Sequence, residues 1–139
     1  LGKYEASKRG ADEGIFTDGE DRVSEGTSSN LFIVRSGVIK TPPVQGRCCL
    51  GALPGITRGY VLELALAKGM KVMEAIITAD RLEGCDEAFI TNSISGIVPL
   101  IAVDCKAIAS RRPGPVTTAI QEMYSGLVLE VCKTSCKRG

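Results

Sequence analysis

The hydrophobic pattern of this chain changes at Leu53, and this change limits its possible folds more than any other feature. Before Leu53, short apolar runs alternate with turn-forming residues, as in antiparallel hairpins. After Pro54 and Gly55, apolar residues recur at helical spacing in ITRGYVLELALAKG, and Gly69 is placed to end that helix. The pattern predicts a mixed α/β (α+β) fold, with antiparallel hairpins followed by β/α units and no internal repeat.

Turn residues and hydrophobic spacing divide the chain further. In the front half we expect a helix over 1–10 closed by Gly10, two short strands within 14–26 about a turn at Gly19–Asp21, a hairpin over 30–43 with its turn at Ser36–Gly37, and a loop over Val44–Ala52. In the second half we expect a strand over 71–78, a short helix over 79–85 capped by the Thr78 side chain, a strand over 87–92, extended pieces over 93–100 and 101–108, and a last helix starting at Pro115.

Composition excludes several classes of function. The chain has 139 residues, enough for one hydrophobic core, and a formal net charge of +1, so no overall field favours nucleic acid or an anionic membrane. No apolar run is long enough to span a membrane. The absence of His removes the commonest general base and most zinc sites, so no metal is expected. The six cysteines follow no regular spacing, which favours reduced, mostly buried thiols and a cytoplasmic protein.

Three stretches place small residues, backbone N–H groups or hydroxyls where the chain must turn. SEGTSSNLF (24–32) carries Glu25 amid small residues, LPGITR (53–58) opens the main helix with the Thr57 hydroxyl, and FITNSISG (89–96) ends a strand with hydroxyl and amide side chains. Each has an ordinary interpretation, as a surface acid, a water-capped helix start and a capped turn. Together they predict a carboxylate beside an anion-binding helix start.

These stretches occur in a characteristic order, GIFTD, VSEGTSSNLFIV, IKTPP, LPGITRGYVLELA, EAFITNSISGIVPL and PGPVTTAIQEMY. The order resembles the C-terminal large domain of the class IV, fold-type IV pyridoxal-phosphate enzymes, from about Glu5 to Tyr124. These enzymes include branched-chain and D-amino acid aminotransferases and 4-amino-4-deoxychorismate lyases. The resemblance implies the fold of that large cofactor-binding domain and implies pyridoxal 5'-phosphate as cofactor.

The resemblance also implies a role for each matching residue. Glu25 would accept a hydrogen bond from the pyridine nitrogen of the cofactor and keep that nitrogen protonated, so that the ring withdraws electron density from the substrate. The other implied contacts are Leu53 against the ring, the Ile56 and Thr57 amides and hydroxyl on the phosphate, the Ser93 hydroxyl on the phosphate, and the Ile94 amide on the substrate carboxylate. Asn30 and Arg58 are expected to brace these loops.

The Schiff-base lysine of the family would lie before Leu1, so we expect no catalytic residue within this chain. None of Lys3, Lys8, Lys40, Lys68, Lys71 and Lys106 stands at the matching position. We likewise expect the N-terminal small domain of the family to lie outside this chain. We therefore interpret residues 1–139 as a single domain, a fragment that matches the C-terminal cofactor-binding domain and is inactive on its own.

Several functions remain open at this point. The first is an aminotransferase that moves the amino group of a branched-chain or similar amino acid to a 2-oxo acid, in a protein that forms homodimers as its relatives do. The second is a 4-amino-4-deoxychorismate lyase, which releases pyruvate, because TNSI followed by IVP also resembles those enzymes. The third is a remnant without the lysine that has no catalytic activity and serves as an interaction module.

Overall fold

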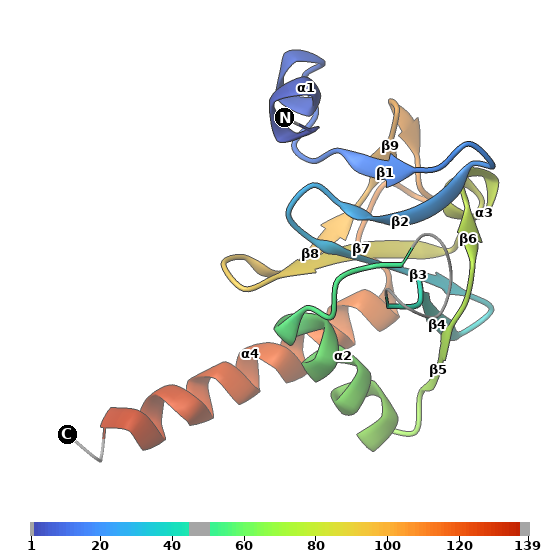
Figure 1. Cartoon of the computed structure of the whole chain (residues 1–139). Coiled ribbons are helices and arrows are strands. Elements are labelled where there is room, and N and C mark those ends of the chain that lie inside the picture. The colour runs from blue at the N-terminus through green and yellow to red at the C-terminus, as the bar shows by residue number, and fades with distance from the viewer. Residues whose placement is uncertain (1, 45–50, 137–139) are drawn as a thin grey trace.

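A computed structural model describes residues 2–44 and 51–136 of the chain (Figure 1). In chain order the elements are α1 (Gly2–Lys8), β1 (Ile15–Thr17), β2 (Arg22–Gly26), β3 (Asn30–Arg35), β4 (Val38–Thr41), α2 (Ile56–Ala67), β5 (Lys71–Glu74), β6 (Ile77–Thr78), α3 (Ala79–Glu83), β7 (Glu87–Asn92), β8 (Gly96–Leu100), β9 (Ala102–Val103), β10 (Lys106–Ala107) and α4 (Pro115–Cys136). The predicted mixture of hairpins and later β/α units is confirmed.

A five-stranded sheet in the order β5-β4-β3-β7-β8 forms the centre of the fold. Its strands pair antiparallel except β4 and β5, which are parallel and are connected through α2. Two neighbouring parallel strands need such a crossover connection, because a tight turn reverses the chain direction and can join only antiparallel strands. A second sheet has the antiparallel order β1-β2-β6, and β9 pairs with β10.

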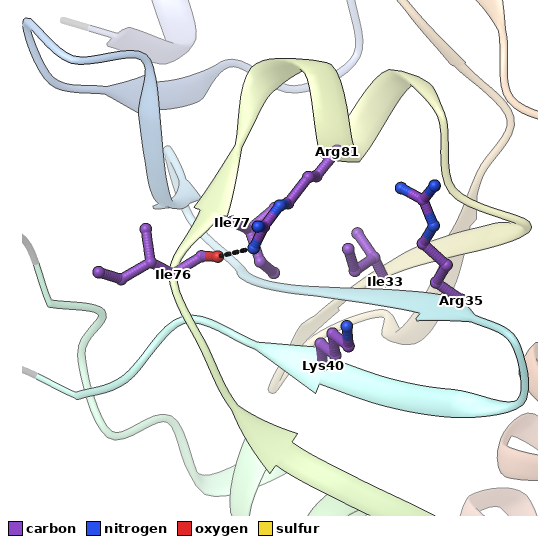
Figure 2. Close-up of a pocket in the computed structure, with 6 residues that line it drawn as sticks. All are labelled: Ile33, Arg35, Lys40, Ile76, Ile77 and Arg81. Atoms are coloured by element: carbon purple, nitrogen blue, oxygen red, sulfur yellow. Dashed lines mark hydrogen bonds between the residues drawn. The ribbon is translucent and has the colours of Figure 1, made fainter.

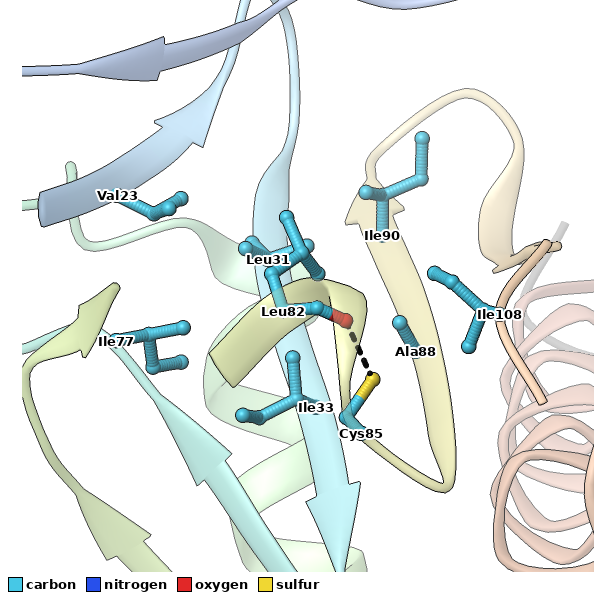
Figure 3. Close-up of a cluster of buried hydrophobic side chains, with 9 residues drawn as sticks. All are labelled: Val23, Leu31, Ile33, Ile77, Leu82, Cys85, Ala88, Ile90 and Ile108. Atoms are coloured by element: carbon cyan, nitrogen blue, oxygen red, sulfur yellow. Dashed lines mark hydrogen bonds between the residues drawn. The ribbon is translucent and has the colours of Figure 1, made fainter. Parts of the chain in front are cut away.

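The two faces of the central sheet carry separate hydrophobic clusters, because successive side chains of a strand point to opposite faces. On one face α2 and α4 cover the helix-side cluster, which consists of Phe32, Val34, Ile39, Val61, Ala65, Phe89, Ile97 and Ile120 (Figure 1). On the other face lies the strand-side cluster, which consists of Val23, Leu31, Ile33, Ile77, Leu82, Cys85, Ala88, Ile90 and Ile108 (Figure 3). Strand β3 contributes alternate residues to both clusters.

Local sequence signals explain most element boundaries. Ser36 and Gly37 both adopt positive φ, 51° and 74°, as the predicted hairpin turn between β3 and β4 requires. Gly69, at φ 72°, follows the end of α2, and Pro115 starts α4. Helix α1 ends before Gly10, which also has positive φ. These predicted starts and stops are confirmed.

Two predicted features in the second half are wrong. The expected single strand over 71–78 is divided into β5 and β6, because β5 pairs with β4 and β6 pairs with β2 in the other sheet. The chain therefore changes sheets between Glu74 and Ile77. Thr78 does stand at the N-cap of α3, but its side chain makes no capping hydrogen bond.

The expectation of mostly buried thiols is also wrong for the cysteines that the structure describes. These are free thiols, and only Cys85 is buried, whereas Cys105, Cys132 and Cys136 are exposed. Cys132 and Cys136 lie on the second half of α4, where few residues are covered by the rest of the fold. Cys48 and Cys49, and most of the loop predicted over Val44–Ala52, lie outside the described residues.

Candidate functional site

The Glu25 carboxylate lies directly beside the turn that precedes α2. Glu25 is half-buried on β2, and its Oε2 accepts a hydrogen bond from the Leu53 amide at 2.9 Å. Asn30 Nδ2 lies 3.4 Å from the same oxygen. The fold thus brings together the two features that sequence analysis assigned to opposite ends of one cofactor.

The start of α2 offers backbone donors that no side chain of the described residues caps. Gly55 is the N-cap residue, in extended conformation, and the first turn of the helix contains no acidic residue. The first N–H groups of a helix have no partner within the helix, and they carry partial positive charge. Thr57 is buried in this turn, whereas Leu53 and Ile56 are 57% and 73% exposed. Such a helix start can bind a phosphate or carboxylate group.

Asn30 and Arg58 hold the loops around this helix start. Asn30 Nδ2 donates to the Leu53 carbonyl at 2.9 Å, and a side-chain carbon added at Gly55 would overlap Asn30 Oδ1. Arg58, which is buried, donates through Nη2 to the Pro42 carbonyl at 3.1 Å and to Glu74 Oε1 at 3.0 Å. Both side chains bond to protein groups in the way that sequence analysis expected of bracing residues.

The turn between β7 and β8 lies at the same end of the central sheet. Asn30 at the start of β3 is paired with Thr91 near the end of β7, so the residues that follow Thr91 are close in space to Asn30. In this turn Asn92 Oδ1 accepts hydrogen bonds from the Ile94 amide at 2.9 Å and from the Ser95 amide at 2.7 Å. Ser93 is exposed and the Ile94 side chain is 97% exposed.

Two residues at this end of the sheet were not predicted from the sequence. One is Asn92, whose side chain organises the turn and engages the Ile94 amide that was predicted to bind a substrate carboxylate. An Asn at a strand end, where its side chain can accept from the amide two residues later, was the available signal. The other is the Thr91 hydroxyl, which is buried at this end of the sheet and has no hydrogen-bond partner among the described residues. Nothing in the local sequence distinguishes it from other strand threonines.

Two of the lysines whose side chains the structure describes make contacts of other kinds. Lys106 pairs with Glu83 at 3.0 Å, and that hydrogen bond raises the pKa of its ammonium group. Lys8 lies 4.6 Å from the centre of the Tyr4 ring. Lys40 lines a surface pocket.

That pocket has a volume of about 330 Å³ and is lined by Ile33, Arg35, Lys40, Ile76, Ile77 and Arg81 (Figure 2). Arg81 donates through Nη1 to the Ile76 carbonyl at 3.3 Å, and none of the predicted site residues contributes to the lining. The described residues contain no group of three or more His, Cys, Asp or Glu side chains that could hold a metal ion. No helix within the same residues has the length and apolar character needed to cross a membrane.

Comparison with known proteins now decides the family. The family model described as amino-transferase class IV matches residues 1–103 of the chain. This chain belongs to the class IV aminotransferase family. It is 42% identical to the branched-chain-amino-acid aminotransferase of Pseudomonas aeruginosa, over 92% of this chain and 40% of that protein. This class IV chain therefore spans less than half the length of such relatives.

Solved structures agree with this assignment. The crystal structure of the Escherichia coli branched-chain amino acid aminotransferase is similar to the class IV chain with a TM-score of 0.85 and 38% identity, over 91% of this chain and 40% of that one. The branched-chain amino acid aminotransferase from Thermobaculum terrenum, in its PLP-form, gives a TM-score of 0.83 and 32% identity, over 92% and 41% of the two chains. The predicted fold of the fold-type IV large domain is confirmed.

Proposed function

We propose that this chain is the cofactor-binding part of a pyridoxal 5'-phosphate-dependent aminotransferase that transfers the amino group of a branched-chain or similar amino acid to a 2-oxo acid. The observation that supports this most directly is the contact between the Glu25 carboxylate and the Leu53 amide, at the uncapped start of α2. A pyridine ring that carries a phosphate needs an acid at one end and an anion site at the other.

The donor set of the chain fits such a cofactor. Glu25 would hold a proton on the pyridine nitrogen, and the Ile56 and Thr57 amides with the Thr57 hydroxyl would bind the phosphate. The Leu53 amide is bonded to Glu25, and Leu53 lies shortly before the start of α2. Its half-exposed side chain would pack on the ring face. When bound, the cofactor withdraws electrons from the substrate carbon that carries the amino group, which makes the proton on that carbon mobile.

The turn between β7 and β8 would complete the site. Ser93 would add a hydroxyl to the phosphate, and the Ile94 amide would bind the substrate carboxylate after exchanging its present hydrogen bond to Asn92. We further propose that the Schiff-base lysine and the small domain belong to residues outside this chain, that the whole protein is a homodimer, and that residues 1–139 are one domain of it. A cytoplasmic location remains a prediction from the cysteine usage.

Binding of pyridoxamine 5'-phosphate tests the proposal, because this form of the cofactor needs no lysine. We expect the chain to bind it in a calorimetric titration and Glu25→Gln to weaken binding by about tenfold or more, since a hydrogen bond between charged groups is lost. Glu122→Gln, an exposed site on α4, is the control and should change nothing. No binding, or equal binding by Glu25→Gln, would contradict the proposal, and no binding would favour the inactive remnant.

A second measurement locates the lysine and the reaction. After treatment with pyridoxal 5'-phosphate and borohydride, peptide mapping should find no single lysine of this chain specifically modified. Specific modification of one lysine would place the Schiff-base residue inside the chain and overturn that part of the proposal. For the reaction, the whole protein that contains the lysine should convert bound pyridoxamine 5'-phosphate to pyridoxal 5'-phosphate when a branched-chain 2-oxo acid is added. Release of pyruvate from 4-amino-4-deoxychorismate would favour the lyase instead.

A further inference from the structure

Asn30 connects the acid and the anion site through one side chain. Its Nδ2 donates to the Leu53 carbonyl at 2.9 Å and lies 3.4 Å from Glu25 Oε2, while the Leu53 amide donates to that same oxygen at 2.9 Å. Glu25, Asn30 and Leu53 therefore form a closed hydrogen-bonded triangle. The triangle joins β2, the start of β3 and the turn before α2, and Leu53 follows Glu25 and Asn30 by 28 and 23 residues in the chain.

The other side of the Asn30 amide lies in close contact with the turn. Its Oδ1 lies against Gly55, where an added Cβ would overlap it, so the turn is seated directly on the Asn30 side chain. Asn30 itself is buried at 6% exposure, and its backbone is paired with Thr91 in the central sheet. Because the Asn30 backbone is paired in the sheet and its side chain is bonded to the turn, Asn30 couples the position of the turn to that of the sheet.

We propose that Asn30 is a positioning residue that sets the spacing between the Glu25 carboxylate and the N-terminus of α2. This inference rests on the proposed function, because that spacing matters for a ligand that bridges the two points. Without Asn30, Glu25 and the turn would still be present, but only the hydrogen bond from the Leu53 amide would connect them. A ligand that touches both points would then lose affinity, while one that touches only the helix start would not.

Hydrogen exchange on the unliganded chain tests the positioning without any ligand. The Leu53 amide, which donates to Glu25, should exchange slowly in the unmodified chain and at least about tenfold faster in Asn30→Asp. Asp has the same shape as Asn but has no donor and repels Glu25. A role in packing alone would leave Leu53 exchange unchanged in Asn30→Asp. The Ile33 and Ile90 amides of the central sheet report whether the fold is intact.

Ligand binding tests the consequence for spacing. Asn30→Asp should weaken the binding of pyridoxamine 5'-phosphate about tenfold or more and that of inorganic phosphate by less than about threefold, since phosphate would contact the helix start and Ser93 but not Glu25. Equal losses for both ligands would overturn the proposal. In a Glu25→Gln background, replacing Asn30 by Ala should lower the affinity for pyridoxamine 5'-phosphate by less than about threefold further, because Asn30 acts through Glu25. Full additivity of the two substitutions would also overturn it.

A second variant covers the case in which Asn30→Asp does not fold. Gly55→Ala puts a methyl group where Asn30 Oδ1 lies, so it should displace the Asn30 side chain and produce the same faster exchange at Leu53. Unchanged exchange at Leu53 in Gly55→Ala would contradict the proposal. Failure of the proposed function gives a different result: the unmodified chain would not bind pyridoxamine 5'-phosphate, whereas the exchange of Leu53 would still depend on Asn30.

Discussion

The buried thiol of Cys85 shows how the surroundings of a single residue change its chemistry. Cys85 lies in the strand-side cluster, and its Sγ donates to the Leu82 carbonyl at 3.0 Å (Figure 3). Burial raises the pKa of the Cys85 thiol from 9.0 to about 11, because the thiolate would lose its hydration. Cys105, Cys132 and Cys136, by contrast, are exposed.

We therefore expect Cys85 to resist alkylation at neutral pH while the three exposed thiols react. Timed labelling with iodoacetamide followed by peptide mass mapping measures each cysteine separately. The raised pKa also has a consequence for stability: the unfolded chain loses the Cys85 proton at lower pH than the folded chain. The contribution of this group to stability is thus present below about pH 9 and is lost between about pH 9 and pH 11. Rapid alkylation of folded Cys85 at neutral pH would contradict the predicted resistance of this thiol.

For individual residues, the sequence predicted the members of the candidate site better than the contacts between them. The positions of Glu25 and Thr57 could be predicted because a carboxylate amid small residues and a hydroxyl at a helix start are local patterns. The contact of Glu25 with the Leu53 amide could not, since it joins residues 28 positions apart through the packing of two sheets and a helix. The engagement of the Ile94 amide by Asn92 depends on one side-chain rotamer, which sequence does not specify.

Among the elements, α4 shows the clearest example of long-range capping. Glu87 at the start of β7 is buried, and its carboxylate accepts hydrogen bonds from the Val116 amide at 3.1 Å and the Thr117 amide at 2.7 Å. These amides belong to the first turn of α4, where a negative charge is stabilising. Gly114 precedes the helix, and a Cβ at this position would overlap the Glu87 side chain.

Two glycine substitutions in this region should have opposite effects on stability. Gly114→Ala should lower the free energy of unfolding by about 1–3 kcal/mol, because Glu87 is held by two hydrogen bonds and cannot move aside freely. Gly126→Ala, within α4 and with no neighbour near its added Cβ, should raise it by about 0.5–1 kcal/mol through helix propensity. Urea denaturation measures both values. Equal effects of the two substitutions would show that the contact with Glu87 is unimportant.

Element boundaries were predictable where one local signal decides them, as at Gly69 and Pro115. The division of 71–78 into β5 and β6 was not, because KVMEAIIT contains no Gly, Pro or other turn signal that would indicate two sheets. The parallel pairing of β4 with β5 was also absent from the prediction of an antiparallel front half. Both features follow from tertiary packing, which overrides local β propensity.

In the whole molecule, the central sheet makes the two hydrophobic clusters depend on each other. Leu31 and Ile33 of β3 belong to the strand-side cluster, whereas Phe32 and Val34 belong to the helix-side cluster. Strand β7 does the same, and its Phe89 ring stacks on Phe32 with centres 4.9 Å apart. Loss of either cluster would expose one face of the strands that support the other, so the two should not unfold separately.

Ile120→Ala tests this coupling, because Ile120 is fully buried in the helix-side cluster and Cys85 reports on the strand-side cluster. The substitution should lower the free energy of unfolding by about 2–5 kcal/mol. Followed in urea, the far-ultraviolet circular dichroism of the helices and the labelling of Cys85 should give one common midpoint, which Ile120→Ala lowers equally for both. Leu129→Ala, at a 61% exposed position of the same helix, should change stability by less than about 0.5 kcal/mol. If Ile120→Ala lowers the midpoint of circular dichroism alone, the two faces of the sheet unfold independently and the two clusters are not coupled.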